Sequence, residues 1–95
     1  MSVHHSSVTI PNPAVAVALS TQRTPCFEII VQKNSANSIR VGDKTLTATT
    51  GIAVAALNAA PGPLYLGPYA SFALDLSTTF VIGTAGDVVD FAYVK

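Results

Sequence analysis

The sequence predicts an all-β protein: a compact antiparallel β-sandwich, jelly-roll-like, with an extended N-terminal arm. Two observations support this fold class. Turn-forming residues recur about every eight to twelve positions, the spacing of short strands in a sandwich or barrel. Between the turns, apolar and polar residues alternate with the period of a strand, and no segment has a clear helical pattern. We therefore divide the chain into an arm, residues 1–13, and a β-sandwich domain, residues 14–95.

The expected strands are short. In the first half of the chain they are 8–10, 14–20, 25–32, 38–41 and a threonine-rich piece at 45–50. In the second half they are 64–66, 71–76, 79–82 and 88–94. A polar turn is expected at 33–38. Residues 83–87 contain two glycines and are expected to be a hairpin connection.

One segment is ambiguous. Residues 51–60 are rich in alanine, which favours a helix. A segment of this length bounded by glycine and proline would make only a short helix, so we predict strand or irregular structure there. An α+β domain with one helix at 51–60 is the alternative.

Alternation within the strands predicts which side chains face the core. In 25–32 one face carries Phe27, Ile29 and Val31, and the other carries Cys26, Glu28 and Ile30. In 88–94 one face carries Val89, Phe91 and Tyr93, opposite Asp90. The phenylalanines expected in the core are Phe27, Phe72, Phe80 and Phe91.

The chain has few charges. Charged residues make up 11% of its 95 residues, and five Lys+Arg balance five Asp+Glu, whereas ordinary soluble domains have about 25% charged residues. Surfaces without net charge tend to self-associate, so we interpret the deficit as a surface covered by copies of the chain or by partners. A monomer with a surface of serine and threonine is the alternative.

Several partners and destinations are not expected. The cations are scattered, which argues against nucleic acid. No apolar run approaches the length of a membrane span, and no signal peptide is recognisable. We therefore expect neither a membrane nor export by a Sec-type route, and we expect synthesis in a cytoplasm.

No residues have the spacing of a catalytic, cofactor or metal site. His4 and His5 point to opposite faces of an extended segment, and only Cys26 is available as a further His or Cys ligand. Cys26 is expected to be a small buried thiol without a disulfide partner. The acidic residues lack the spacing of a calcium loop; they are Glu28, Asp43, Asp75, Asp87 and Asp90. No G-x-S-x-G motif is present, so we expect no enzyme, no cofactor and no metal.

Three stretches resemble small structural proteins of tailed bacteriophages. They are 37–43 (NSIRVGD), 49–51 (TTG) and 74–89 (LDLSTTFVIGTAGDVV). The most distinctive string is Val81-Ile82-Gly83, then Ala85-Gly86-Asp87, before the terminal strand. The resemblance covers about residues 24–95.

This resemblance implies a virion component with a compact β-sandwich and no catalytic residues. The expected function is that of a head decoration (cement) protein, which binds the major capsid protein, stabilises the head and associates with itself, a trimer being favoured. A tail, baseplate or fibre-attachment module that binds a tail protein is one alternative. A carbohydrate- or receptor-binding β-sandwich is the other, for which Tyr65, Tyr69 and Asp75 are the plausible set.

Four residues are predicted to form the interface with a partner or a second subunit. Val8 and Ile10 belong to residues 2–13, an apolar-alternating segment expected to add to the sheet edge of a neighbour. Tyr65 and Tyr69 lie in a stiff loop rich in proline and glycine. Tyrosine in such a loop either contacts a partner or caps one end of the core.

Overall fold

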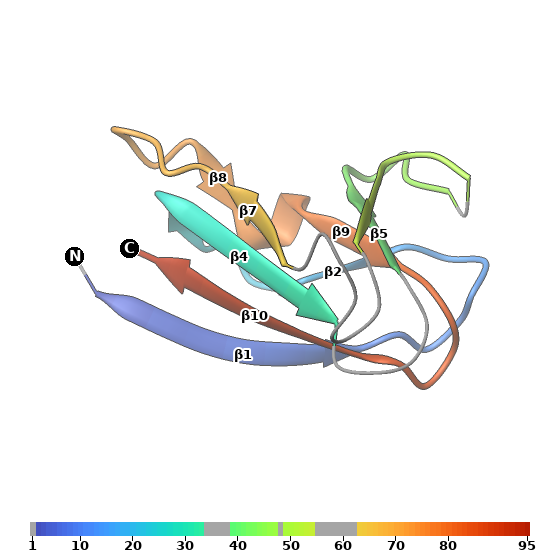
Figure 1. Ribbon diagram of the computed structural model, residues 1–95. Coiled ribbons are helices and arrows are strands. Elements are labelled where there is room, and N and C mark those ends of the chain that lie inside the picture. Colours follow the sequence, from blue (N-terminus) through green and yellow to red (C-terminus); the bar gives the residue numbers. More distant parts are fainter. Residues whose placement is uncertain (1, 34–38, 48, 55–62) are drawn as a thin grey trace.

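The computed structural model describes residues 2–33, 39–47, 49–54 and 63–95 (Figure 1). In these ranges the strands are β1 (Val3–Thr9), β2 (Val17–Ala18), β3 (Pro25–Cys26), β4 (Glu28–Lys33), β5 (Ile39–Gly42), β6 (Ile52–Val54), β7 (Leu64–Leu66), β8 (Leu74–Asp75), β9 (Phe80–Ile82) and β10 (Val88–Val94). A short 3-10 turn, η1 (Leu76–Thr78), follows β8. The described part of the chain is all-β, as predicted.

All strand pairs of the described residues are antiparallel. One four-stranded sheet has the order β1-β10-β4-β7, a second has the order β2-β9-β5-β6, and β3 pairs with β8. The radius of gyration is 12.3 Å, and a compact chain of this length has about 12.4 Å.

One hydrophobic cluster joins the two four-stranded sheets. Its buried members are Ile10, Leu19, Cys26, Ile29, Val31, Ile39, Val41, Val54, Leu76, Val81, Val89 and Phe91. Tyr93 is half-buried and packs against this cluster, so the predicted inward face of the last strand is confirmed. Most members are β-branched, and such side chains pack well on a pleated sheet.

The segment predicted to be a free arm lies on the sheet of its own chain. β1 pairs with β10 over seven residues, from Val3 opposite Val94 to Thr9 opposite Val88. Ser2 and Lys95 exchange two backbone hydrogen bonds of 2.7 and 3.0 Å, which hold the two ends of the chain together. Ile10 is fully buried. Residues 3–10 are therefore part of the sheet and core, because every second side chain of this segment lies on the inner face of the sheet.

The predicted strand 25–32 is interrupted at Phe27. Cys26 and Ile29 are both fully buried although they are three residues apart, so the alternation slips by one residue between β3 and β4. The thiol of Cys26 is free and buried, as predicted. Phe27 is only half-buried, and its ring centroid lies 4.2 Å from that of Phe72, which is 57% exposed. The core positions predicted for Phe27 and Phe72 are therefore wrong, whereas Phe91 is buried. Phe80 is half-buried and does not belong to the hydrophobic cluster.

The connection 83–87 crosses between the sheets, so the predicted hairpin is wrong. β9 pairs with β2 and β5, whereas β10 pairs with β1 and β4. A Cβ on Gly83 would lie 2.9 Å from Cγ2 of Ile39 and 3.0 Å from Cδ1 of Ile10, so a side chain would collide with the core. Gly86 has a φ of 87°, which favours glycine. The two glycines allow a tight crossing over the core.

Three other predicted segments differ in detail. The threonine-rich piece is turned rather than extended, since the N–H of Leu46 donates to the carbonyl of Asp43 (3.0 Å) and the N–H of Thr50 donates to that of Thr47 (3.3 Å). The strands predicted at 14–20 and 71–76 shrink to β2 and β8. Residues 52–54 of the ambiguous segment are strand β6, and 55–60 lie outside the described residues, as does most of the polar turn at 33–38.

Candidate partner interface

The sheet β1-β10-β4-β7 has one face on the core and one face turned outward. Its register aligns one outward row across all four strands, with His5 opposite Ala92, Ala92 opposite Ile30, and Ile30 opposite Tyr65. A second outward row places Ser7 opposite Asp90 and Asp90 opposite Gln32. We call these seven residues the outer face.

An open groove of about 690 Å³ lies over the outer face. It is lined by His5, Ser7, Ile30, Gln32, Asp90 and Ala92, together with Ser6 and Phe91. The small side chain of Ala92 lies between the larger side chains of His5 and Ile30, which leaves the surface hollow there. The lining offers an imidazole, hydroxyls, an amide and a carboxylate beside aliphatic groups. The groove therefore combines hydrogen-bonding and apolar groups on one open surface.

The outer face has little charge. Its rows contain one carboxylate, Asp90, and no lysine or arginine. The neighbouring outward row, formed by Val3, Val94 and Glu28, adds a second carboxylate. Arg23 precedes β3, and Arg40 lies on β5 of the other sheet, where its guanidinium donates to the carbonyl of Gly51 (3.1 Å). This face therefore presents mainly neutral groups to solvent.

The two tyrosines predicted as contact residues are both exposed. Tyr65, on β7, is 60% exposed, and Tyr69, in the loop that follows, is 53% exposed. This loop is anchored by the N–H of Tyr69, which donates to the carbonyl of Phe27 (3.0 Å). The exposed fractions favour partner contact over capping of the core, and contact itself stays a prediction.

The other two predicted interface residues contact the core of their own chain. The side chain of Ile10 is fully buried, and Val8 is partly buried and packs against the hydrophobic cluster. In this conformation they stabilise β1 on its own sheet. The residues of β1 whose side chains face outward are instead Val3, His5, Ser7 and Thr9, which alternate with the inward ones.

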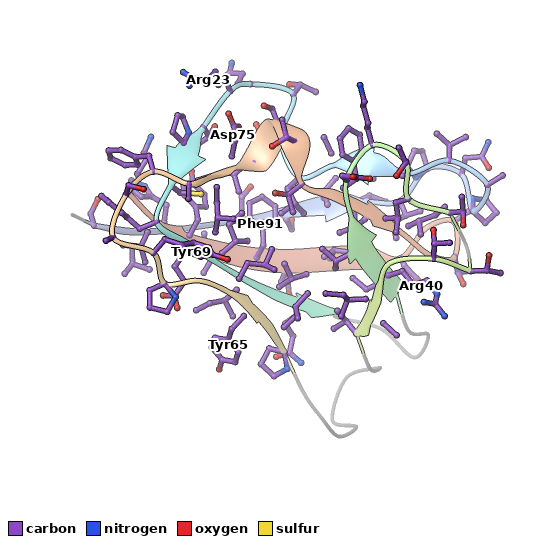
Figure 2. The ribbon with its side chains drawn as sticks, turned by 90° about the horizontal axis from the view of Figure 1, so that it is seen from above. Arg23, Arg40, Tyr65, Tyr69, Asp75 and Phe91 are labelled. Atoms are coloured by element: carbon purple, nitrogen blue, oxygen red, sulfur yellow. The ribbon has the colours of Figure 1, made fainter. Side chains whose placement is uncertain are left out.

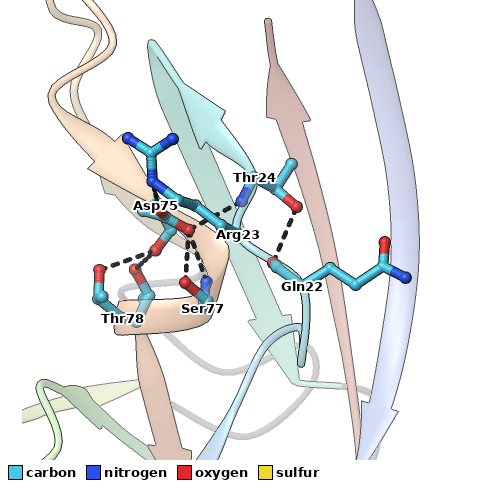
Figure 3. Close-up of polar contacts among 7 residues, drawn as sticks. Gln22, Arg23, Thr24, Asp75, Ser77 and Thr78 are labelled. Carbon is cyan, nitrogen blue, oxygen red and sulfur yellow. Dashed lines mark hydrogen bonds and ion pairs between the residues drawn. The ribbon is translucent and has the colours of Figure 1, made fainter.

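The residues suggested for sugar binding, Tyr65, Tyr69 and Asp75, do not form one site. Figure 2 shows Asp75 beside Arg23 on one side of the molecule and Tyr65 on the opposite side. Asp75 instead holds two loops (Figure 3): its Oδ1 accepts hydrogen bonds from the N–H of Thr24 (2.9 Å) and from the N–H and hydroxyl of Ser77 (2.9 and 2.8 Å). The backbone carbonyl of Asp75 accepts hydrogen bonds from the hydroxyls of Thr78 and Thr79 (3.2 and 2.9 Å).

Two carboxyl pKa values reflect these local bonds. At Asp75, desolvation acts to raise the pKa, but hydrogen bonds from Thr24 and Ser77 and the charge of Arg23 outweigh it and hold the pKa below its usual value. The pKa of Asp43 is lowered by the hydroxyl and N–H of Thr45, which donate to its Oδ1. Both carboxylates are therefore explained as turn and cap groups.

The remaining candidates for chemistry lie apart. His4 turns inward and stacks on Tyr93, with ring centroids 5.2 Å apart, while His5 is exposed on the outer face, as their adjacency predicts. Among the described residues, no three His, Cys, Asp or Glu side chains are grouped so that they hold a metal ion. Within the same ranges, no helix is long and apolar enough to cross a membrane.

Sequence reasoning missed most of the outer face. Alternation correctly placed Ile30 and Asp90 opposite the core, but it did not show that β10 pairs with β4. His5, Gln32 and Ala92 carry no motif, and only the strand order brings them together.

The fold and this surface define an all-β protein in which the sheet β1-β10-β4-β7 has a grooved face turned to solvent. No protein-family model, no curated protein and no solved structure matches the chain.

Proposed function

We propose that this chain is a structural virion protein that binds the outer surface of a bacteriophage capsid as a decoration (cement) protein and stabilises the head. Its two four-stranded sheets form a jelly-roll-like β-sandwich, and its partner is the major capsid protein. Copies of the chain also associate with one another. The observation that supports this function best is the outer face, a nearly neutral surface with a groove on a regular sheet.

Attachment to a capsid needs a contact that is modest for each copy and is repeated by symmetry. The outer face suits such a contact, because its groove has room for a side chain that protrudes from a partner. Tyr65, at the end of the same row, adds large apolar area at little entropic cost.

The residues that carry the resemblance have structural explanations. Gly83 and Gly86 permit the crossing between the sheets, and the carbonyl of Asp87 accepts the N–H of Ile10 (2.9 Å). The resemblance therefore supports a shared β architecture and transfers no ligand site.

The variant Ala92→Arg tests this function. Ala92 lies in the outward row, so the arginine fills the groove without entering the core. Ala53→Arg is the matched control, because Ala53 is an exposed strand residue on the other sheet. Each purified protein is mixed with heads produced without this chain, and the bound fraction is measured after sedimentation.

We expect wild type and Ala53→Arg to bind alike and Ala92→Arg to lose about ten-fold or more in affinity, which corresponds to about 1.4 kcal/mol. Equal binding of both variants would exclude the outer face as the attachment surface. Failure of the wild type to bind heads would contradict the decoration function.

A carbohydrate- or receptor-binding protein is the second candidate. Tyr65 lies on the same face as the polar side chains of Gln32 and Asp90, a combination of stacking platform and polar partners that sugars require. A glycan array bound by the wild type but not by Tyr65→Ala would support this function over capsid binding.

A further inference from the structure

β1 is the outermost strand of its sheet (Figure 1), and among the described strands only β10 pairs with it. The direction of its backbone groups follows from the bonds at its two ends. Ser2 exchanges two hydrogen bonds with Lys95, and Ile10 bonds with Gly86 and Asp87. Bonded and non-bonded positions alternate along an antiparallel strand. Even-numbered residues of β1 therefore bond to β10, and the N–H and C=O groups of Val3, His5, Ser7 and Thr9 point toward the free edge.

This edge lacks the features by which soluble proteins block unwanted pairing. Edge strands are protected by proline, by charged side chains, by bulges or by shortness. β1 has the sequence VHHSSVT, without proline or any Lys, Arg, Asp or Glu. Its seven residues pair with β10 without a break in register, so no bulge twists the edge away.

We propose that β1 pairs antiparallel with β1 of a second copy of this chain, about a two-fold axis at Ser6. Val3 then lies opposite Thr9 of the second copy, and His5 lies opposite Ser7 of the second copy. This register uses all seven residues of both strands, and its hydrogen-bonded pairs are formed by the odd-numbered residues that face the edge. The result is one continuous sheet of two four-stranded halves.

The β1 edge is better suited to pairing with a second copy than the opposite edge of the same sheet is. An isologous contact pairs identical strands of equal length, and β1 has no charged side chain that would repel its copy. The opposite edge of the sheet is β7, with three residues against seven in β1. A ring of three copies joined from β1 to β7 would therefore leave most of β1 unpaired.

The two-fold pair rests on the proposed self-association but not on binding to a capsid. It joins the outer faces of two copies into one surface, since the side chains of His5 and Ser7 lie on that face in both. Two grooves then lie on one rigid sheet, so that one pair makes two contacts with a capsid and gains effective concentration from the second.

Cysteine crosslinking tests the register. Two Ser6 residues face each other as a non-hydrogen-bonded pair, with Cα atoms about 4.5 Å apart, within the range of a disulfide. Two Thr9 residues are about 20 Å apart in the same arrangement, because six residues of strand separate them. Mild oxidation of the full chain should therefore give a disulfide-linked dimer with Ser6→Cys and none with Thr9→Cys. The native Cys26 is fully buried and does not compete. Crosslinking of both variants alike, or of neither, would overturn the register.

Sedimentation velocity of the free protein tests the pairing itself, over concentrations up to about 0.5 mM, because a contact of one strand pair is at the weak end of protein interfaces. The wild type should sediment as a dimer, and Ser7→Pro should be monomeric with an unchanged far-UV circular dichroism spectrum, since it removes an N–H that faces the edge. Ser6→Pro removes a bond to β10 and should lower thermal stability instead.

Ser7→Lys keeps the N–H and adds a charge at the edge, so it should also be monomeric. A monomeric wild type, or a dimer that persists in Ser7→Lys, would overturn the proposal. Because this measurement needs no heads, its failure is separate from a failure of capsid binding.

Discussion

Replacing Asp75 with alanine should lower the free energy of unfolding by about 3 kcal/mol. The carboxylate accepts the N–H of Thr24 and the N–H of Ser77, both at 2.9 Å, and its side chain is only 18% exposed. Hydrogen bonds to a charged group contribute about 1.5–3 kcal/mol each, and partial exposure favours the lower end for both. The ion pair with Arg23 adds little, because Arg23 is 81% exposed and the Nε–Oδ2 distance is 3.6 Å.

Asp43→Ala is the matched control. Asp43 also accepts bonds in a turn, but only from Thr45, two residues away, and it is exposed. Loss of such a local, exposed bond should lower the stability much less than loss of the bond from Thr24 to Asp75. The bond from Thr24 to Asp75 spans 51 residues of sequence and holds the β3–β8 pair together.

Urea denaturation followed by circular dichroism measures both changes. With a denaturant slope of about 2 kcal/mol per molar, the midpoint should fall by about 1.5 M for Asp75→Ala and by much less for Asp43→Ala. Equal midpoints for the two variants would show that the hydrogen bond between Thr24 and Asp75 contributes no more to stability than a bond within a surface turn does.

Three further predictions follow from local features. Because the pKa values of Asp75 and Asp43 are lowered in the folded protein, the unfolded chain takes up protons at higher pH. The contribution of these carboxylates to stability should therefore be complete above about pH 4 and be lost as the pH falls through the folded-state pKa values. Asp75→Asn should weaken this dependence in acid titrations, and an unchanged profile would contradict it. Gly83→Ala places a methyl group 2.9 Å from Cγ2 of Ile39 and should cost about 1–3 kcal/mol, visible as a lower melting temperature; an unchanged melting temperature would argue against the tight crossing. Burial, and secondarily the charge of Asp75, raises the pKa of Cys26, so a thiol reagent should label it slowly in native protein and quickly in urea; fast native labelling would contradict its place in the core.

The fold class and the last strand were predictable because their signals are local. Alternation over 88–94 placed Val89 and Phe91 inward, and the structure agrees. The same reasoning failed at Phe27, because one irregular residue between β3 and β4 reverses the direction of every side chain before it.

Features that depend on strand order were not predictable. Glycines in 83–87 predicted a turn but not that β9 and β10 belong to different sheets. Residues 2–13 are predicted to add to the sheet edge of a neighbour through Val8 and Ile10, whereas residues 3–9 pair with β10 of their own chain. Pairing requires a partner strand, and the sequence does not say which chain supplies it.

The site residues divide in the same way. The loop rich in proline and glycine left partner contact and capping of the core open for Tyr65 and Tyr69, and the structure shows both to be exposed. Burial of Ile10 depends on the crossing that covers it. The outer face needed four strands to be placed side by side before its rows of residues existed.

The copy number of this chain in purified phage particles tests the proposed function most directly. Quantitative mass spectrometry measures the ratio of the chain to the major capsid protein. A decoration protein predicts a ratio near one, or a simple large fraction of one. A handful of copies per particle would place the chain in the tail or fibre, and its absence from the particle would contradict a virion function altogether.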